Sequence, residues 1–581
     1  AAVDRGDEYK KLDVDPAWAN LADDAEVADD APAFVKELVR PMNAQVGDLL
    51  KVSDFVKHGT IDGIWSVGTA AYDKRGVAAF VPTWDAENCI QCNKCAYCCP
   101  HATIRPFVLD DNEKAGFEGT TMDILAPKQL KGMQFRIQVD VLDCLGCGNC
   151  ADVCPGKKGE KALVMAPFNV DDPNMKKEEA NWEYMVKHVK SKQDLVDIKQ
   201  SPKNSQFAQP LFEFSGACAG CGETPYVKLV TQLFGERMMI ANATGCSSIY
   251  GGSAPSTPYT TNSCGEGPAW ASSLFEDNAE YGYGMFQAVN TVRHRIAKLM
   301  TECESEVAPE LADLFVEWRE NIDDGDKTTE LRDKMIPLLE KETGAKAKEI
   351  LELKQYLVKK SIWMFGGDGW AYDIGYGGLD HVLASGDDVN ILVLDTEVYS
   401  NTGGQASKSS PAGSVAKFAS AGKPVKKKDL AAISMTYGNI YVARISMGAN
   451  QNQALKAIRE AEAYPGPSII IAYSPCIAHG LKEGMGKSQT EEKLATEVGY
   501  WPILRFDPRL AEKGKNPLQL DSKSPAWDKY EEFLKRERRY TTLLAEFPDH
   551  AKVLFEMNLK NAKDTWNYYK RMAAMDYSTE E

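Results

Sequence analysis

The chain has 581 residues, a net charge of −17 and a pI near 5.1, so several hydrophobic cores are expected and most of the surface should repel a polyanion. No apolar run approaches the ~20 residues of a membrane span, and the start AAVDRGDEYKK lacks the apolar core of a signal peptide. These features exclude nucleic-acid binding as the main function, membrane insertion and export, and we expect a cytoplasmic protein.

Residues 1–83 are predicted to be a leader or connecting segment. An acidic start is followed by short apolar stretches that glycines interrupt, such as GIWSVGTAAY. No chemistry is assigned to this segment. Because residue 1 is Ala rather than Met, we expect a processed chain or one piece of a longer polypeptide.

Two cysteine motifs define the next predicted domain, residues 84–167. They read CIQCNKCAYCCP and CLGCGNCADVCP, and both fit C-x2-C-x2-C-x3-C-P. Without an export signal, the 15 cysteines should be thiols or metal ligands. In ferredoxins with two [4Fe–4S] clusters, the fourth cysteine of each motif serves the other cluster. The predicted sets are Cys89, Cys92, Cys95 and Cys154 for one cluster, and Cys144, Cys147, Cys150 and Cys99 for the other.

Zinc is the alternative for these motifs because it also accepts four thiolates, but a longer loop normally separates the C-x2-C pairs of a zinc site. Cys98 is left over and is interpreted as a packing residue. His101 is interpreted as structural, with tuning of a cluster potential by hydrogen bonding as the alternative.

Residues 168–212 are charged and rich in lysine, which predicts a surface helix and a linker. A larger domain is predicted over 213–500, because apolar runs alternate with Gly-rich turns and helical segments, the pattern of a parallel sheet covered by helices. A charged helical insertion is expected at about 285–360. Residues 501–581 should form a helical tail that packs on this domain or on a neighbouring subunit.

Four apolar runs of the larger domain lead to unusual residues. The runs RMMIANATGC, SIWMFGGDG, NILVLDTEVYSN and PSIIIAYSPC carry Cys246, Asp368, Thr396 and Cys476. Ligands of open α/β sheets bind beyond the carboxyl ends of the strands, so these residues should gather at one edge.

Gly-Asp-Gly after one strand, and Asp-Thr-Glu with an Asn five residues beyond Thr396 after the next, indicate a site for a metal-bound diphosphate. A carboxylate, a hydroxyl and backbone carbonyls are the oxygen ligands that Mg2+ prefers, and the glycines would let the backbone approach a diphosphate. This spacing is similar to the thiamine diphosphate fingerprint. A tight strand–helix turn with an N-capping Asp is the alternative.

The chain resembles the C-terminal half of the pyruvate:ferredoxin (flavodoxin) oxidoreductase family of 2-oxoacid oxidoreductases. The resemblance covers nearly the whole chain, including GTAAYDKRGVAAFVPTWDAENCIQCNKC, SGACAGCGETPYVKL, ATGCSSIYGGSAPSTPY and DTEVYSNTGGQASKSS. It implies an α/β fold, with a thiamine-diphosphate-binding parallel-sheet domain and a small α+β ferredoxin-like domain that holds two [4Fe–4S] clusters.

The resemblance also implies site residues. It assigns a third, proximal [4Fe–4S] cluster to Cys218, Cys221, Cys246 and Cys476. It places Glu223, Cys246 and Phe275 against the thiamine, Gly367, Asp368, Gly369 and Trp370 around the diphosphate, and Thr396, Glu397, Val398, Tyr399, Ser400 and Asn401 along the cofactor. Mg2+ would be bound by the Asp368 carboxylate, the Thr396 hydroxyl and the Val398 carbonyl. Catalytic roles would fall to Cys246 and to Asn401, which would reach the substrate. Cys264 and Cys303 match no ligand position and are interpreted as structural.

The reaction that the resemblance implies is the oxidative decarboxylation of pyruvate with coenzyme A to acetyl-CoA and CO2, in anaerobic metabolism. Electrons would pass singly through the three clusters to ferredoxin or flavodoxin. Family members bind pyruvate and coenzyme A through N-terminal domains that residues 1–83 are too short to hold, so we expect those domains elsewhere in the enzyme, which should be a homodimer as a whole. The alternatives are the same chemistry on another 2-oxoacid and an electron-transfer subunit alone.

Two lysine-rich loops, KKGEK at 157–161 and KPVKKK at 423–428, are interpreted as solvated loops. Docking of an acidic ferredoxin is the alternative for each, because complementary charge speeds the encounter of two proteins.

Overall fold

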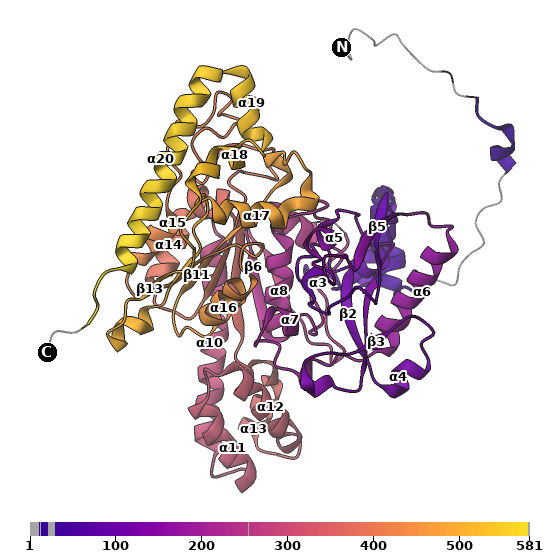
Figure 1. The fold of residues 1–581 in the computed structure, drawn as a ribbon. Coiled ribbons are helices and arrows are strands. Elements are labelled where there is room, and N and C mark those ends of the chain that lie inside the picture. The colour runs from indigo at the N-terminus through magenta and orange to yellow at the C-terminus, as the bar shows by residue number, and fades with distance from the viewer. Residues whose placement is uncertain (1–10, 12, 21–29, 254, 579–581) are drawn as a thin grey trace. The chain divides into compact units, whose positions relative to one another are not determined.

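Short helices make up the first of the two units into which the chain divides, Ala1–Ile64 and Trp65–Glu581. The computed structural model describes residues 11, 13–20, 30–253 and 255–578 (Figure 1), so much of the acidic start of the predicted leader lies outside the described residues. The helical elements of this unit are η2 (Pro16–Asn20), η3 (Val35–Val39), α1 (Arg40–Asn43), η4 (Gly47–Leu49) and α2 (Val52–Lys57).

The second unit begins with a small α+β region that carries both cysteine motifs. Strand β1 (Phe80–Trp84) pairs antiparallel with β5 (Leu163–Pro167), which brings the two ends of the region together. Between them lies a three-stranded antiparallel sheet in the order β2 (Ile104–Leu109), β4 (Gln134–Val139), β3 (Met122–Asp123). Each motif leads into a short helix, α3 (Lys94–Tyr97) or α5 (Asn149–Val153). The ferredoxin-like α+β prediction is confirmed.

The lysine-rich segment that follows forms α6 (Pro173–His188). Its Glu178 accepts a hydrogen bond from Arg136 of β4 at 2.8 Å, and Trp182 and Met185 are buried. This helix therefore packs on the ferredoxin-like sheet with one face while its lysines point outward.

An eight-stranded sheet dominates the rest of the second unit. Its order is β13 (Leu518–Leu520), β12 (Leu504–Phe506), β10 (Tyr441–Ile445), β11 (Ser468–Tyr473), β9 (Asn390–Asp395), β8 (Ser361–Gly367), β6 (Met238–Asn242), β7 (Ala269–Ser272). The six strands from β10 to β7 are parallel, whereas β12 and β13 are antiparallel. Parallel strands buried on both faces have continuous apolar sequences, and the parallel-sheet prediction is confirmed.

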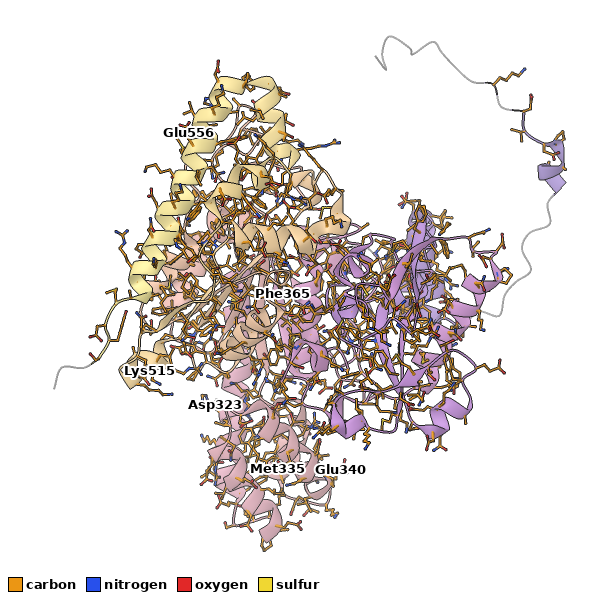
Figure 2. All side chains as sticks on the ribbon, in the orientation of Figure 1. Asp323, Met335, Glu340, Phe365, Lys515 and Glu556 are labelled. Carbon is orange, nitrogen blue, oxygen red and sulfur yellow. The ribbon has the colours of Figure 1, made fainter. Side chains whose placement is uncertain are left out.

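Alternate residues of the strands face two different cores. In β8, Trp363 and Phe365 pack with α8 (Thr224–Phe234) and α16 (Gln451–Glu462), and Phe365 lies deep among the side chains of the molecule (Figure 2). Ile362 and Met364 face the other core, which contains α14 (Tyr376–Ala384). The C-terminal helices α19 (Arg538–Glu546) and α20 (Pro548–Ala573) also cover this second face.

The predicted C-terminal tail is not wholly helical, because residues 504–520 add β12 and β13 to the sheet before the helices begin. The charged insertion consists of α10 (Asn278–Cys303), α11 (Pro309–Glu320), α12 (Gly325–Leu339) and α13 (Ala345–Glu352). These four helices have a core of their own that includes Trp318 and Met335 (Figure 2). Shorter helices are α4 (Asp111–Ala115), α7 (Pro202–Ser205), α9 (Cys246–Ser248), α15 (Leu430–Met435), α17 (Ser488–Glu497) and α18 (Tyr530–Leu534). No helix among the described residues combines the length and the hydropathy that a membrane span needs.

Candidate functional site

Four strand ends bring predicted site residues to one edge of the sheet. Asp368 follows β8, Thr396 follows β9, and Cys246 and Cys476 lie a few residues beyond β6 and β11. These four strands run parallel to one another, so their carboxyl ends share an edge, where open α/β sheets bind ligands.

The three predicted Mg2+ ligands meet at the Thr396 hydroxyl. This oxygen lies 3.0 Å from Asp368 Oδ1 and 3.0 Å from the Val398 carbonyl oxygen. Asp368 has no exposed surface, and burial together with the charge of Asp395 raises the pKa of the Asp368 carboxyl well above its usual range. A cation would compensate a carboxylate in this position. The carboxylate, hydroxyl and carbonyl therefore fit Mg2+ by chemistry and by placement.

The predicted diphosphate-binding residues differ in the space around them. A Cβ added to Gly367 would meet no atom closer than 3.8 Å, whereas one at Gly369 would lie 2.4 Å from the Tyr399 ring. The indole N–H of Trp370 is buried and has no hydrogen-bond partner among the described residues. The open space at Gly367 fits the close approach of a phosphate group, whereas the Trp370 N–H lies against Gly375.

Glu223, predicted to lie against the thiamine, is only 4 % exposed. Tyr250 donates a hydrogen bond to Glu223 Oε2 at 3.0 Å, and burial raises the pKa of Glu223 to about 7. Phe275 is half-buried in the turn after β7, and Asn401 is exposed in the turn after Ser400. The structure brings neither Phe275 nor Asn401 into hydrogen-bonding contact with the other predicted site residues.

The four cysteines assigned to a proximal cluster converge from three parts of the chain. Burial and the charges of Glu223, Cys476, Cys221 and Cys218 all raise the pKa of Cys246, so Cys246 interacts with each of the other three thiols. His479 connects this set to the Mg2+ ligands, since its Nε2 lies 2.6 Å from the Thr396 carbonyl oxygen and its Nδ1 accepts a hydrogen bond from the Cys476 N–H at 3.4 Å.

The eight ferredoxin-type cysteines are arranged across the two motifs. Besides burial, the charge of Cys154 raises the pKa of both Cys89 and Cys95. In the same way, Cys99 acts on all three cysteines at the start of the other motif, Cys144, Cys147 and Cys150. Each fourth cysteine thus influences cysteines of the other motif, the pairing that a ferredoxin with two clusters requires.

Several cysteine sulfurs already accept backbone hydrogen bonds. In each case the donor is the N–H two residues further on, at 3.4 Å, in the pairs Cys89–Gln91, Cys144–Gly146, Cys221–Glu223 and Cys476–Ala478. Hydrogen bonds to cluster sulfurs favour the reduced state. Among the described residues, no three His, Cys, Asp or Glu side chains converge on a single ion position, whereas a [4Fe–4S] cluster binds each thiolate to a different iron.

Cys98 and His101 both have structural contacts. Cys98 is completely buried and its thiol lies 3.5 Å from the Cys95 carbonyl oxygen. The two ring nitrogens of His101 face the carbonyl oxygens of Ser215 at 3.1 Å and Cys218 at 3.3 Å. His101 therefore joins the ferredoxin-like region to the loop that carries Cys218 and Cys221.

The sequence did not predict the buried network behind the Mg2+ ligands. The Glu397 carboxylate accepts hydrogen bonds from Lys427 at 2.9 Å and from Arg539 at 2.8 Å. Although burial opposes it, the charges of these two residues hold the pKa of Glu397 well below its usual range. His479 Nε2 lies 2.6 Å from the Thr396 carbonyl oxygen. Glu397 thus contacts the supporting network rather than the predicted cofactor space.

Both interpretations of the loop 423–428 were wrong for two of its lysines. Lys423 is 7 % exposed and donates to the carbonyls of Ser407 and Ser410 at 2.7 and 2.6 Å. Lys427 pairs with Asp395 at 2.9 Å as well as with Glu397. These lysines face inward because buried carboxylates and carbonyls of the cofactor edge need their charge.

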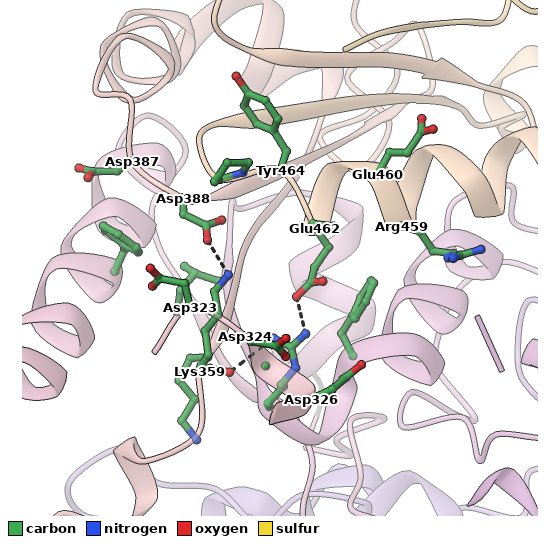
Figure 3. A pocket seen from close by; sticks show the side chains of 18 of the residues that line it. Asp323, Asp324, Asp326, Lys359, Asp387, Asp388, Arg459, Glu460, Glu462 and Tyr464 are labelled. Carbon is green, nitrogen blue, oxygen red and sulfur yellow. Dashed lines mark hydrogen bonds and ion pairs between the residues drawn. The ribbon is translucent and has the colours of Figure 1, made fainter. Parts of the chain in front are cut away.

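A cavity of about 1050 Å³ opens at the opposite edge of the sheet (Figure 3). Its lining includes residues that precede the strands, such as Arg237, Lys359 and Asp388. Lys359 pairs with Asp388 at 2.7 Å, and Arg237 pairs with Glu462. None of the predicted site residues lines this cavity, and its charges largely neutralise one another.

Three family models match the chain. One is described as a domain of unknown function and covers residues 21–78. A 4Fe-4S dicluster domain matches residues 82–158. The C-terminal TPP-binding domain of thiamine pyrophosphate enzymes matches residues 343–472.

Curated relatives match nearly the whole chain. It is 51 % identical to the pyruvate:ferredoxin oxidoreductase of Moorella thermoacetica, over 99 % of this chain and 49 % of that protein. It is 49 % identical to the pyruvate-flavodoxin oxidoreductase of Klebsiella pneumoniae, over 96 % of this chain and 47 % of that protein. A mitochondrial pyruvate dehydrogenase (NADP+) of Euglena gracilis is 48 % identical, over 98 % of this chain and 31 % of that protein. The chain thus spans about half the length, or less, of the relatives it matches.

Proposed function

Because this chain belongs to the pyruvate:ferredoxin (flavodoxin) oxidoreductase family, we propose that it carries the thiamine diphosphate and iron–sulfur part of an enzyme that converts pyruvate and coenzyme A to acetyl-CoA and CO2. The proposal assigns pyruvate and coenzyme A recognition to N-terminal domains of the same homodimeric enzyme. The relatives named for pyruvate favour this substrate over another 2-oxoacid.

One relationship carries the proposal: His479 Nε2 donates to the Thr396 carbonyl oxygen at 2.6 Å, and its Nδ1 accepts a hydrogen bond from the Cys476 backbone N–H at 3.4 Å. A site for a metal-bound diphosphate and a set of four cysteines therefore share a wall. Thiamine diphosphate, when bound, supplies a carbanion that adds to the ketone of a 2-oxoacid and accepts the electrons that decarboxylation releases. A four-cysteine set next to the thiamine site is suited to hold a cluster that removes those electrons.

The roles of the residues follow from their environments. Asp368, Thr396 and Val398 would hold Mg2+, and Gly367 to Trp370 would surround the diphosphate. Cys246 lies beside Glu223, and with a pKa near 7 that glutamate can hold or release a proton at neutral pH. The exposed Asn401 would contact the substrate once other domains cover the edge.

The contacts among the cysteine loops favour one order of electron transfer. The segment Met485–Gly486 packs between the proximal loop and Cys147, since a Cβ added to Gly220 would meet the Met485 carbonyl oxygen and one added to Gly486 would meet the Cys147 carbonyl oxygen. Cys147 belongs to the set with Cys144, Cys150 and Cys99. The set with Cys89, Cys92, Cys95 and Cys154 would receive the electrons next. The lysines that follow Cys154 in the sequence are exposed at the surface of the protein. Electrons would leave there for ferredoxin or flavodoxin.

Anaerobic reconstitution with Mg2+ and thiamine diphosphate tests the proposal. We expect an induced circular dichroism signal that requires both additions. About twelve iron and twelve sulfide per chain would support three cubanes. A chain that binds iron but gives no thiamine signal would be an electron-transfer subunit only, and acetyl-CoA formation by the isolated chain would contradict the need for other domains.

A further inference from the structure

A buried lysine joins the thiamine-type sheet domain to the cysteine motifs. Lys228 lies in α8, which begins directly after Glu223, and its side chain is almost completely buried, with 1 % of the residue exposed. Its ammonium donates hydrogen bonds to three carbonyl oxygens of the first motif: those of Ala96, of Tyr97 at 3.1 Å and of Cys99 at 3.2 Å. All three N–H groups therefore point at the end of α3.

The hydrogen bonds satisfy the ammonium but do not neutralise its charge. In the part of the chain that the structure describes, no carboxylate lies within 4.0 Å of Lys228 Nζ. Carrying an uncompensated charge into the interior is unfavourable. The buried ammonium therefore favours a negatively charged group close by.

The nearby negative groups are cysteines of both predicted ferredoxin-type sets. Lys228 donates to the carbonyl of Cys99 and to that of Ala96, the residue directly after Cys95, and Cys99 and Cys95 belong to different sets. A [4Fe–4S] cluster with four thiolates carries a net negative charge that grows by one unit on reduction. A fixed cation beside both sets would therefore stabilise the reduced form of each cluster more than the oxidised form.

We propose that Lys228 is a charge-compensating residue that raises the reduction potentials of the two ferredoxin-type clusters. The step it assists is the addition of one electron to a cluster, with no bond made or broken and with the lysine keeping its proton. This inference rests on the proposed function, because it requires those clusters. It gives the sheet domain a direct electrostatic influence on the electron path.

The test replaces Lys228 in the whole, anaerobically reconstituted chain. Lys228→Met removes the charge at similar length, and Lys228→Gln removes it while keeping an N–H donor. Lys334→Met, on the exposed face of the helical insertion, is the matched control for the loss of one positive charge. Potentiometric titration followed by electron paramagnetic resonance measures each cluster, and iron and sulfide analysis shows whether the clusters are present.

We expect both Lys228 variants to retain their iron, with reduction equilibria of the ferredoxin-type clusters weakened at least tenfold, about 59 mV for a one-electron couple. The cluster bound by Cys99 should shift most, and Lys334→Met should match the wild type. Unchanged potentials in iron-replete variants would overturn the inference. Loss of iron from both variants would overturn it too, because Lys228 would then be needed for assembly rather than for tuning. Since the readout is a potential, failure of the thiamine site would leave this result unaffected.

Discussion

Arg539 Nη2 donates a hydrogen bond to Glu397 Oε2 at 2.8 Å, although 142 residues separate the two in the sequence. Both side chains are buried. Glu397 has a φ of 59°, in the left-handed region that a residue other than glycine adopts at a cost of about 1 kcal/mol or more. Because Glu397 stands between Thr396 and Val398, this contact fixes the turn that presents both of their oxygens to Mg2+.

Replacing Arg539 by Met should weaken the binding of thiamine diphosphate and Mg2+ at least tenfold. Removing one partner of a buried ion pair costs about 3–5 kcal/mol, and part of this cost would appear as disorder of the turn at Thr396. Titration of thiamine diphosphate at fixed Mg2+, followed by circular dichroism, measures the affinity. Arg571→Met, at an exposed position of α20, is the control. Wild-type affinity for thiamine diphosphate in a folded Arg539→Met variant would refute the role of Arg539 in fixing the turn.

Asp368→Asn should abolish Mg2+-dependent binding of thiamine diphosphate while leaving the iron content unchanged. The substitution keeps the shape but removes the carboxylate that the Thr396 hydroxyl meets at 3.0 Å, and a neutral amide is a much weaker ligand for Mg2+. Parallel metal analysis and circular dichroism would separate the two cofactor types. A Mg2+-dependent circular dichroism signal in Asp368→Asn would show that the metal binds elsewhere. Glu340→Gln, at an exposed position of the helical insertion, is the control.

Adjacent cysteines should behave differently when changed to Ala. Cys99 is the fourth cysteine of the first motif and raises the pKa of Cys144, Cys147 and Cys150, whereas Cys98 lies outside the motif spacing and its thiol is 3.5 Å from the Cys95 carbonyl oxygen. Cys99→Ala should lose one cubane, about four of roughly twelve iron atoms, and Cys98→Ala none. Iron and sulfide analysis of each variant measures the loss. Equal iron loss in both variants would contradict the exchange of fourth ligands between the two motifs.

Charge reversal at Lys157 and Lys158 should slow electron transfer to an acidic ferredoxin. Both lysines are exposed just after Cys154, and complementary charges accelerate association by tenfold or more at low salt. Stopped-flow oxidation of the dithionite-reduced chain by ferredoxin, repeated at several ionic strengths, should give a lower rate and a weaker salt dependence for the double Glu variant. Lys341 and Lys348, exposed on the insertion, provide the matched double variant. An unchanged salt dependence would place the docking surface elsewhere.

The sequence predicted those parts of the site that short spacings encode. The two cysteine motifs and the residues after β8 and β9 each lie within a few positions, so their geometry follows from local structure and from the parallel sheet. The proximal cysteines needed a family resemblance, because Cys246 and Cys476 occur singly, each a few residues after a different strand.

The direction of the Glu397 side chain could not be predicted from spacing. Its partner Arg539 is 142 positions away, and Lys427 lies in a loop whose composition resembles a solvated surface. Such contacts depend on which distant segments the fold places together. Lys228 shows the same limit, since its carbonyl partners precede it by 129 to 132 residues.

Glu492 should make stability depend on pH. Its carboxylate has no exposed surface and accepts hydrogen bonds from the Gly448 N–H at 2.7 Å and the Tyr226 hydroxyl at 3.1 Å. Burial raises its pKa from 4.5 to about 8. Below pH 4.5 the folded and unfolded states both hold the proton, so Glu492 contributes nothing to the pH dependence there. Between pH 4.5 and 8 only the folded state holds it, so the free energy of unfolding falls as pH rises, by at most about 1.4 kcal/mol per pH unit.

Glu492→Gln removes this titration, and its stability relative to the wild type should therefore rise from pH 5 to pH 8 by a few kcal/mol. Anaerobic urea unfolding at several pH values measures the difference, with Glu556→Gln on the exposed face of α20 as control (Figure 2). A stability difference that stays constant with pH would mean that Glu492 is ionised in the folded protein. The hydrogen bonds from Gly448 and Tyr226 would then outweigh its burial, because they stabilise the charged form.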